Sequence, residues 1–255
     1  SAHQLHSGIT HPLLKTDYQL ELQNIFLPIP HISIRLIMIA GVDEAGRGPV
    51  IGPMVIAGVQ TTDQNIFRQL KVKDSKKLSA KKRTFLADQI KQRAEKIEFL
   101  VISASDIDDM RKVMTMNEIE VHGFTKIIKK LKPDQCFVDA ADVNSARFGS
   151  DISRQLPKKI EVISKHKADD IYPIVSAASI IAKTIRDKEI QMIGKKLEKK
   201  LSKPLGSGYP SDPITQKFLN EWVKKYKKLP PHTRKSWKTA QRIYAQHTRK
   251  TLDDF

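Results

Sequence analysis

Apolar residues in this chain come in short continuous runs separated by stretches with helical periodicity. The runs at 37–42, 54–59, 99–102, 136–138 and 160–163 predict buried strands, because each is short and bounded by polar or turn-forming residues. The short connection between the first two runs favours antiparallel pairing. Helical patterns separate the later runs, so the sequence predicts an α/β fold with a mixed central sheet flanked by helices.

Two of the predicted helices have recognisable starts. Ser79 is a suitable N-cap for a helix that turns Phe85, Leu86 and Ile90 inward. Asn117 followed by Glu120 resembles a capping box at the start of a second helix. That helix carries apolar residues at helical spacing, namely Phe124, Ile127, Ile128 and Leu131, and Pro133 ends it.

The pattern divides the chain into three regions. Residues 1–37 have no sustained period and are predicted to be an N-terminal extension or an added leader, with Met38 a plausible natural start. Residues 38–200 carry the strands and helices, including a long helix from Ile174 to about Lys200 whose small residues at 176–179 allow close approach to the sheet. Residues 201–255 begin with a glycine- and proline-rich hinge and are predicted to be helical and basic.

Charge narrows the class of partner. The 255 residues include 45 Lys and Arg against 28 acidic residues, a formal net charge of +17. Residues 191–255 alone carry 16 Lys and Arg against 5 acidic residues. A polyanionic partner is the natural interpretation, and a basic surface that serves only solubility is the alternative.

Cysteine content and hydropathy indicate the compartment. The single cysteine, Cys136, excludes an internal disulfide framework and a zinc site with several thiolates. No apolar stretch reaches the roughly 18 residues of a membrane-spanning helix. The sequence therefore predicts a protein of a reducing compartment, the cytoplasm or the nucleus, with the cytoplasm preferred.

Acidic residues follow several of the predicted strands. Asp43, Asp139 and Asp169 each come at or shortly after a strand end, so they are expected to converge on one rim of the sheet. Carboxylates are the ligands that Mg²⁺ and Mn²⁺ prefer, and two such ions can promote phosphodiester hydrolysis. Glu44 joins the site only if the strand ends at Asp43, because neighbouring residues on a strand point to opposite faces.

The first acids are followed by the loop Gly46-Arg47-Gly48. Its glycines let the backbone come close to a ligand, and Arg47 adds positive charge. A P-loop would need Lys and then Ser or Thr after its last glycine, and a dinucleotide-binding loop would lead into a helix rather than an apolar strand. The loop therefore indicates a different kind of phosphate-binding site.

Seven short strings, spread from Met38 nearly to the C-terminus, match one known family: GVDEAGRGP (41–49), DSKKL (74–78), VDA (138–140), KAD (167–169), SAASIIAK (176–183), GSGYP (206–210) and RKSW (234–237). Taken together, these strings resemble ribonuclease HII, the type 2 ribonuclease H, and its archaeal and eukaryotic branch most closely. The resemblance implies a ribonuclease H-like catalytic domain over 38–200 and a substrate-binding region over 201–255.

The resemblance also implies an activity. Such an enzyme cuts the RNA strand of RNA/DNA hybrids and nicks DNA on the 5′ side of an embedded ribonucleotide, leaving 3′-hydroxyl and 5′-phosphate ends. Asp43, Glu44, Asp139 and Asp169 would bind two Mg²⁺ or Mn²⁺ ions. The 46–48 loop would contact the ribonucleotide and its phosphate largely through its backbone, and Tyr209 would pack on the sugar at the RNA-to-DNA junction.

Other residues leave alternatives open. Lys76, Lys77 and Lys183 are either phosphate contacts or solvated surface lysines. Three polar residues near the acids are interpreted as structural: Asp142, Asp170 as a helix cap, and His166 as part of a loop. A non-catalytic nucleic-acid-binding subunit of the same fold, or a polynucleotide transferase, is the alternative function. The length favours a monomer.

Overall fold

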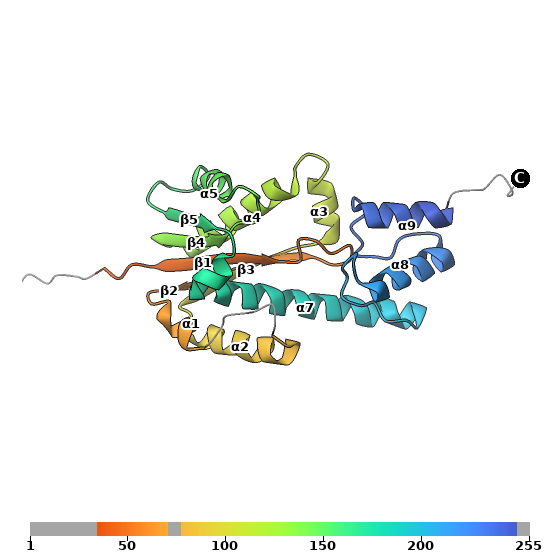
Figure 1. Cartoon of the computed structure of the whole chain (residues 1–255), viewed down its shortest axis with the longest axis horizontal. Helices are drawn as coiled ribbons and strands as arrows, with labels where there is room; N and C mark the ends of the chain where they lie inside the picture. Colours follow the sequence, from red (N-terminus) through yellow and green to blue (C-terminus); the bar gives the residue numbers. More distant parts are fainter. Residues whose placement is uncertain (1–34, 71–77, 249–255) are drawn as a thin grey trace, which may run out of the picture. The chain divides into compact units, whose positions relative to one another are not determined.

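The computed structural model describes residues 35–70 and 78–248. Within this part a five-stranded sheet has the strand order β3-β2-β1-β4-β5 (Figure 1). The strands are β1 (Ile39–Ala45), β2 (Met54–Thr61), β3 (Lys96–Ile102), β4 (Gln135–Asp139) and β5 (Glu161–Lys165). β1, β2 and β3 pair antiparallel, whereas β1, β4 and β5 pair parallel. The predicted mixed sheet and the antiparallel pairing of its first two strands are confirmed.

Helices cover both faces of the sheet. α4 (Met116–Leu131) and α5 (Ser145–Ser153) pack on one face, and α7 (Pro173–Leu201) and α2 (Ala80–Arg93) pack on the other (Figure 1). The predicted inward residues of α4, from Phe124 to Leu131, are buried. The remaining helices are α1 (Asn65–Gln69), α3 (Ala104–Met110), α6 (Ala168–Ile171), α8 (Pro213–Tyr226) and α9 (Lys238–Thr248).

The contact between α7 and β1 is unusually close. The small residues at 176–179 are buried, as predicted. A Cβ atom at Gly41 would lie 2.5 Å from the carbonyl carbon and oxygen of Ile174, so only glycine lets the helix backbone lie directly on the strand. This approach sets how near the residues of α7 come to the acids of β1.

Gly41→Ala is therefore expected to destabilise the fold by at least about 2 kcal/mol, because the obstructing atoms are backbone and cannot rotate away. Gly194→Ala, on helix α7, is the matched control. Its Cβ would make ordinary van der Waals contacts with the Glu198 carboxylate at 3.4 Å and Leu205 at 3.8 Å, and alanine favours helices over glycine by about 1 kcal/mol. Denaturant unfolding should show opposite signs for the two variants, and equal effects would contradict the close packing.

Besides the hydrophobic clusters on the two faces of the sheet, a third one joins the C-terminal helices to α7 and to the loop after β1. Side chains of α8 and α9, with Trp222 among the largest, pack with the end of α7 and with Val50 and Ile51 from the loop after β1. The described residues from Ile37 onward accordingly form one compact unit. α7 ends at Leu201, where Ser202 adopts a left-handed conformation. The functional boundary at residue 200 stays a prediction.

Strand β1 is longer than the sequence predicted. It continues through Asp43 and Glu44 to Ala45, which pairs with Val55. Its parallel pairing with β4 ends earlier, at Val42 with Val138. β1 therefore stops pairing with β4 before Asp43 but goes on pairing with β2 beyond Glu44. The expectation that Asp43 and Glu44 follow the end of the strand was wrong for the pairing with β2.

Three helix predictions were also wrong. Phe85 is 62% exposed, because the buried stripe of α2 runs through Leu86, Ala87 and Ile90. The capping box of α4 consists of Thr115 and Glu118, not Asn117 and Glu120. Asp170 caps no helix, since α7 begins at Pro173 after Tyr172 without a side-chain cap.

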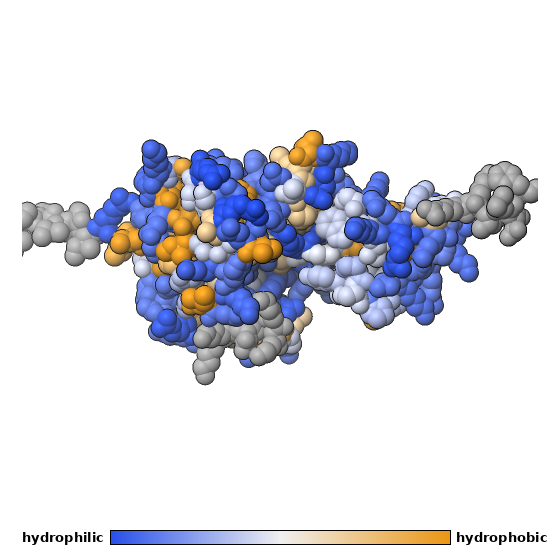
Figure 2. Space-filling view, turned by 45° about the horizontal axis from the view of Figure 1, so that its top comes forward, coloured by the Kyte–Doolittle hydropathy of each residue, from blue (hydrophilic) through white to orange (hydrophobic). Residues whose placement is uncertain are grey.

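The surface of the protein is mainly hydrophilic, as the high content of charged residues predicts. Figure 2 shows hydrophilic residues over most of the face in view, with scattered hydrophobic patches. Of the helices in the described residues, none is both long enough and apolar enough to cross a bilayer.

Candidate active site

Strand register brings two of the predicted acids together. Val42 and Val138 are partners in the parallel pair of β1 and β4, so Asp43 and Asp139 come next on adjacent strands. Gly41 faces α7, and residues two apart on a strand share a face, which puts Asp43 on the α7 side. Phe137 belongs to the core on that side, and Asp139 follows it by two residues.

A third acid comes from the short helix α6. Asp169 is 5% exposed, and one carboxylate oxygen each of Asp43, Asp139 and Asp169 lies within 4.8 Å of the others. The Ala168 amide donates to Asp139 Oδ1 at 3.0 Å, and the Ser176 hydroxyl donates to the Asp169 carbonyl. Three carboxylates this close, two of them buried and that of Asp139 half-buried, repel one another unless a cation lies between them, so the donor set fits a hard divalent ion.

The electrostatic environment of Asp43 reflects this crowding. Burial and, after it, the negative charge of Asp139 raise the pKa of Asp43 to about 6, although Ser179 and Lys183 oppose the rise. Both opposing side chains come from α7, where Lys183 Nζ donates to Ser179 Oγ at 2.8 Å. Close packing of α7 on β1 thus places a hydroxyl and an ammonium group beside the acids.

The raised pKa predicts how stability depends on pH in chelator. Because the folded-state pKa of about 6 exceeds the ordinary 3.8, the folded state binds this proton more tightly and gains stability as pH falls from about 6 to 4. Asp43→Asn removes the charge, so it should raise the free energy of unfolding near pH 7.5 by up to about 3 kcal/mol, with a smaller gain towards pH 4. Denaturant unfolding at both pH values tests this, and an equal gain at both would contradict it.

Glu44 does not join the three aspartates within 4.8 Å. Although β1 continues past Asp43, Glu44 stays beside it, because the two side chains share a hydrogen bond. Burial raises the pKa of Glu44 well above its ordinary value, and the charges of Asp43 and Asp139, followed by this hydrogen bond, add to the rise. The buried Oε2 atom of Glu44 accepts no hydrogen bond from the described residues.

The loop at 46–48 is held from the C-terminal part of the chain. Arg234 is completely buried and donates to the carbonyls of Gly46 at 2.5 Å, Arg47 at 2.7 Å and Gly52 at 3.1 Å. Burial lowers the pKa of Arg234 to about 9. A buried guanidinium with three carbonyl acceptors fixes the path of this loop.

The same contacts orient the loop amides. Because the C=O and N–H of a trans peptide point in opposite directions, holding the Gly46 and Arg47 carbonyls inward directs the amides of Arg47 and Gly48 outward. No acceptor in the described residues takes either amide. Trp237 Nε1 donates to the Gly48 carbonyl at 3.1 Å and completes the support.

Tyr209 lies against this loop. A Cβ atom at Gly48 would come within 3.7 Å of the Tyr209 ring. The Arg186 guanidinium lies 4.9 Å from the ring centroid and is 7% exposed. One edge of the ring therefore faces the glycine loop, and Arg186 steadies the ring.

The turn that carries Tyr209 is fixed by an acid. Asp212 accepts from the amide and the hydroxyl of Ser207 at 2.7 and 2.8 Å, and from the Ile214 amide at 2.9 Å. These hydrogen bonds, led by the Ser207 amide, lower the pKa of Asp212 to about 2. Arg186 also donates to the Ser207 carbonyl at 2.7 Å.

These groups surround one cavity of about 470 Å³. It lies beside the acid cluster and is lined by Glu44, Ala45, Gly46, Arg47, Gly48, Arg83, Lys183, Arg186, Asp187 and Tyr209. Arg47 is paired with Glu120 and Arg83 with Asp187. Lys183 and Arg186 still outnumber the remaining acid, Glu44, so the lining is cationic, which suits a phosphate-containing ligand.

Other residues singled out from the sequence lie elsewhere. Lys76 and Lys77 are outside the described residues. Asp142 binds Arg147 and the Asn144 amide, and His166 Nε2 lies 3.1 Å from the Val143 carbonyl. Neither belongs to the acid cluster, and Asp170 is exposed.

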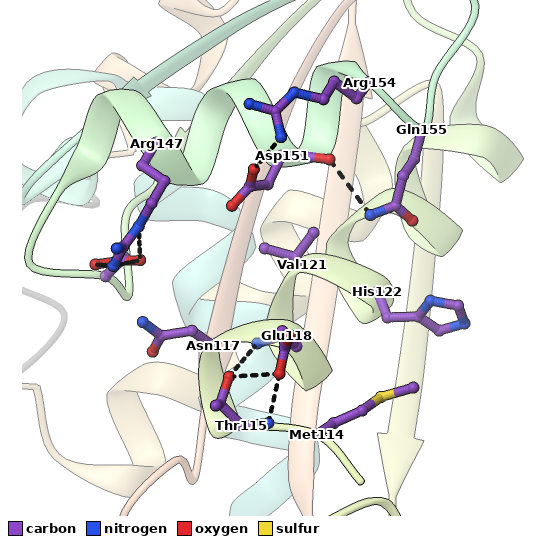
Figure 3. A pocket seen from close by; sticks show the side chains of 11 residues that line it. Met114, Thr115, Asn117, Glu118, Val121, His122, Arg147, Asp151, Arg154 and Gln155 are labelled. Atoms are coloured by element: carbon purple, nitrogen blue, oxygen red, sulfur yellow. Dashed lines mark hydrogen bonds and ion pairs between the residues drawn. The ribbon is translucent and has the colours of Figure 1, made fainter.

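A larger cavity of about 710 Å³ lies between α4 and α5. Figure 3 shows Arg147 on α5 and Arg154 just after it above Asn117 and Glu118 on α4 and the N-cap residue Thr115. Arg147 is paired with Asp142 and Arg154 with Asp151, so these two arginines are already neutralised by acids of the chain. This cavity does not have the cationic lining of the smaller one.

Comparison with known proteins decides the family. The ribonuclease HII family model matches residues 40–240. Ribonuclease HII of Methanosarcina barkeri is 50% identical over 216 residues, which cover 81% of this chain and 95% of the relative. The chain belongs to the ribonuclease HII family. It is a ribonuclease H and a metal-dependent hydrolase, because members of the family have that activity.

Solved structures of the ribonuclease HII family agree. The crystal structure of ribonuclease H2 from Pyrococcus horikoshii is 42% identical, with a TM-score of 0.76 and coverage of 84% of this chain and 100% of that one. Ribonuclease HII from Archaeoglobus fulgidus, solved in complex with PCNA, is 41% identical, with a TM-score of 0.73 and coverage of 85% and 100%. The predicted ribonuclease H-like fold is confirmed.

Sequence reasoning missed several residues of this ribonuclease HII site. Arg234 and Trp237 were recognised only as part of a matching string, and Arg186 and Ser179 received no role. The spacing of Arg186, Lys183 and Ser179 along one helix was an available signal, because residues three and four apart share a face. Nothing local to Arg234 indicated carbonyl partners about 190 positions earlier.

Proposed function

We propose that this ribonuclease H cuts the RNA strand of RNA/DNA hybrids and nicks DNA 5′ to an embedded ribonucleotide, leaving 3′-hydroxyl and 5′-phosphate ends. The observation that carries the proposal is a cluster of three aspartates, two of them buried, beside a cationic cavity that contains both the 46–48 loop and Tyr209. Asp43, Asp139 and Asp169 hold the catalytic ions. Glu44 lines the same cavity and contributes the fourth carboxylate.

Two Mg²⁺ or Mn²⁺ ions held by these carboxylates would supply activation of a water and stabilisation of charge on the phosphoryl oxygens. The residues of the chain do the rest. The carboxylates position the ions, and Lys183 contributes positive charge at the cavity for the phosphate. The outward amides of Arg47 and Gly48 bind the ribonucleotide and its flanking phosphate through backbone donors, so Gly46, Arg47 and Gly48 form the recognition loop.

The C-terminal region binds the flanking duplex. Its basic residues on and after α8 include Lys217, Lys224, Lys225, Lys227 and Lys228, and α9 adds Lys238 and Arg242. Lysines and arginines neutralise backbone phosphates without reading sequence. Lys76 and Lys77 stay candidates for further phosphate contacts, and a cytoplasmic monomer stays a prediction.

The test uses three labelled duplexes: DNA with one ribonucleotide, a long RNA/DNA hybrid, and DNA alone. Each is incubated with Mg²⁺, with Mn²⁺ or with chelator. The proposal requires a nick on the 5′ side of the ribonucleotide, cleavage of the hybrid, no cleavage of DNA alone, and no cleavage in chelator. Cleavage of the hybrid without a nick at the single ribonucleotide would reject the junction activity.

Tyr209→Ala should weaken cleavage at a single ribonucleotide by about tenfold or more and affect the long hybrid less. The reason is that the ring packs on one sugar at the junction, and stacking contacts are worth about 1–3 kcal/mol. Tyr209→Phe keeps the ring and serves as the matched control. Values of kcat/KM on both substrates provide the measurement, and an equal loss on the two would contradict the role of Tyr209.

A further inference from the structure

The side chain of Arg47 does not project freely into the cavity. Its Nη1 atom forms an ion pair with Glu120 Oε2, and its Nη2 atom donates to Asn117 Oδ1 at 2.8 Å. Both partners belong to α4 and lie 73 and 70 positions after Arg47 in the sequence. The arginine of the recognition loop is therefore tied to the helix on the opposite face of the sheet from Asp43.

This tie is firm because Glu120 is completely buried. A buried carboxylate needs a cationic or hydrogen-bonding partner, and Arg47 is its one ion-pair partner among the described residues. The other oxygen, Oε1, has no hydrogen-bond partner in the same set. If Arg47 swung away, Glu120 would keep a buried charge without compensation.

The way α4 is capped explains why Asn117 and Glu120 are free of a capping role and can bind Arg47. Thr115 and Glu118 form the capping box, and Figure 3 shows Asn117 pointing away from it. Asn117 and Glu120 are three positions apart, so they share one face of α4, and that face meets Arg47. The polar pair that looked like a helix cap in the sequence instead holds the loop.

The loop is thus fixed from two sides. Arg234 holds the carbonyls of Gly46 and Arg47, and Glu120 with Asn117 holds the Arg47 guanidinium. We infer that Glu120, assisted by Asn117, is a positioning residue that withholds Arg47 from substrate phosphates, so that the loop selects ribonucleotides through its amides. This inference rests on the proposed function of the loop.

Releasing Arg47 should then move two measurements in opposite directions. A displaced loop binds the ribonucleotide less well, whereas a freed guanidinium binds any phosphate backbone better. For Glu120→Ala we expect KM for the single-ribonucleotide duplex to rise about tenfold, with kcat changed less than about twofold. The inhibition constant of unlabelled DNA duplex should fall several-fold. Glu120→Gln, which keeps the shape and one acceptor, should show smaller shifts in the same directions.

Two further variants separate positioning from a general loss of structure. Glu118→Ala removes an exposed capping residue of the same helix, so it should lower the melting temperature and leave KM and the inhibition constant unchanged. In an Arg47→Ala background, Glu120→Gln should no longer change the discrimination between the two duplexes, because its effect passes through Arg47. Additive effects of the two substitutions would overturn the inference.

The outcomes also distinguish the inference from the proposed function. If the unsubstituted protein fails to nick the single-ribonucleotide duplex, the proposed function fails. If it nicks, and folded Glu120→Gln and Asn117→Ala proteins keep the original KM and inhibition constant, only the inference fails. A rise in both constants would likewise overturn it, because that result means a damaged site rather than a released arginine.

Discussion

Asp139→Asn is expected to lower kcat for the single-ribonucleotide duplex by about a thousandfold or more at saturating Mg²⁺. Asp139 ends β4 beside Asp43, and its carboxylate belongs to the group of oxygens within 4.8 Å. Asparagine keeps the shape and removes the negative charge that attracts the ions. Substrate binding should persist, because the 46–48 loop and Tyr209 are untouched. Cleavage is measured with labelled duplex and binding by fluorescence anisotropy.

Asp170→Asn is the matched control for this experiment. Asp170 follows Asp169 directly but is exposed and lies outside the acid cluster. Its substitution should change kcat less than about twofold, as for an ordinary surface residue. Asp169→Asn should behave like Asp139→Asn. Unchanged cutting by Asp139→Asn would remove the acid cluster as the catalytic centre.

Arg234→Ala is expected to be the most destabilising of the substitutions considered, by about 3–5 kcal/mol. It removes donors from the carbonyls of Gly46, Arg47 and Gly52 and opens a void where a completely buried side chain lay. The Arg234 guanidinium also lies 4.8 Å from the Trp237 ring centroid, and that contact is lost. Denaturant unfolding measures the change in free energy.

The control for Arg234 is Arg242→Ala on α9, where the arginine is exposed. It should change stability by less than about 0.5 kcal/mol. Arg234→Lys should give an intermediate loss, because a single ammonium cannot reach all three carbonyls with the geometry of a guanidinium. A loss for Arg234→Ala no larger than that for Arg242→Ala would contradict the anchoring role.

Strand prediction succeeded because apolar runs report burial on both faces of a covered sheet. The runs around Val42 and Val138 marked the two strands that carry Asp43 and Asp139. What the runs could not show was the end of β1. Its last residues stay in the sheet because β2 continues beside them, and an apolar count does not register pairing with a distant strand.

Local patterns also competed with one another. Thr115 with Glu118 and Asn117 with Glu120 both have the spacing of a capping box, and the hydroxyl residue caps the helix. Tertiary contact with Arg47 explains the use of the second pair. Phe85 shows the same limit, because apolar character alone did not reveal that its side of α2 faces away from the core.

The sequence by itself determined most strands and helices, the candidate acidic residues and the family. Periodicity, residue type and matching strings are local properties, so they can be recognised without knowing the fold. Only the tertiary structure decided how the recognition loop is held. Arg234 lies about 190 positions after that loop, and Glu120 more than 70 positions after it. Whether such side chains meet depends on how α4, α7 and the C-terminal helices pack, and packing is a property of the folded chain as a whole.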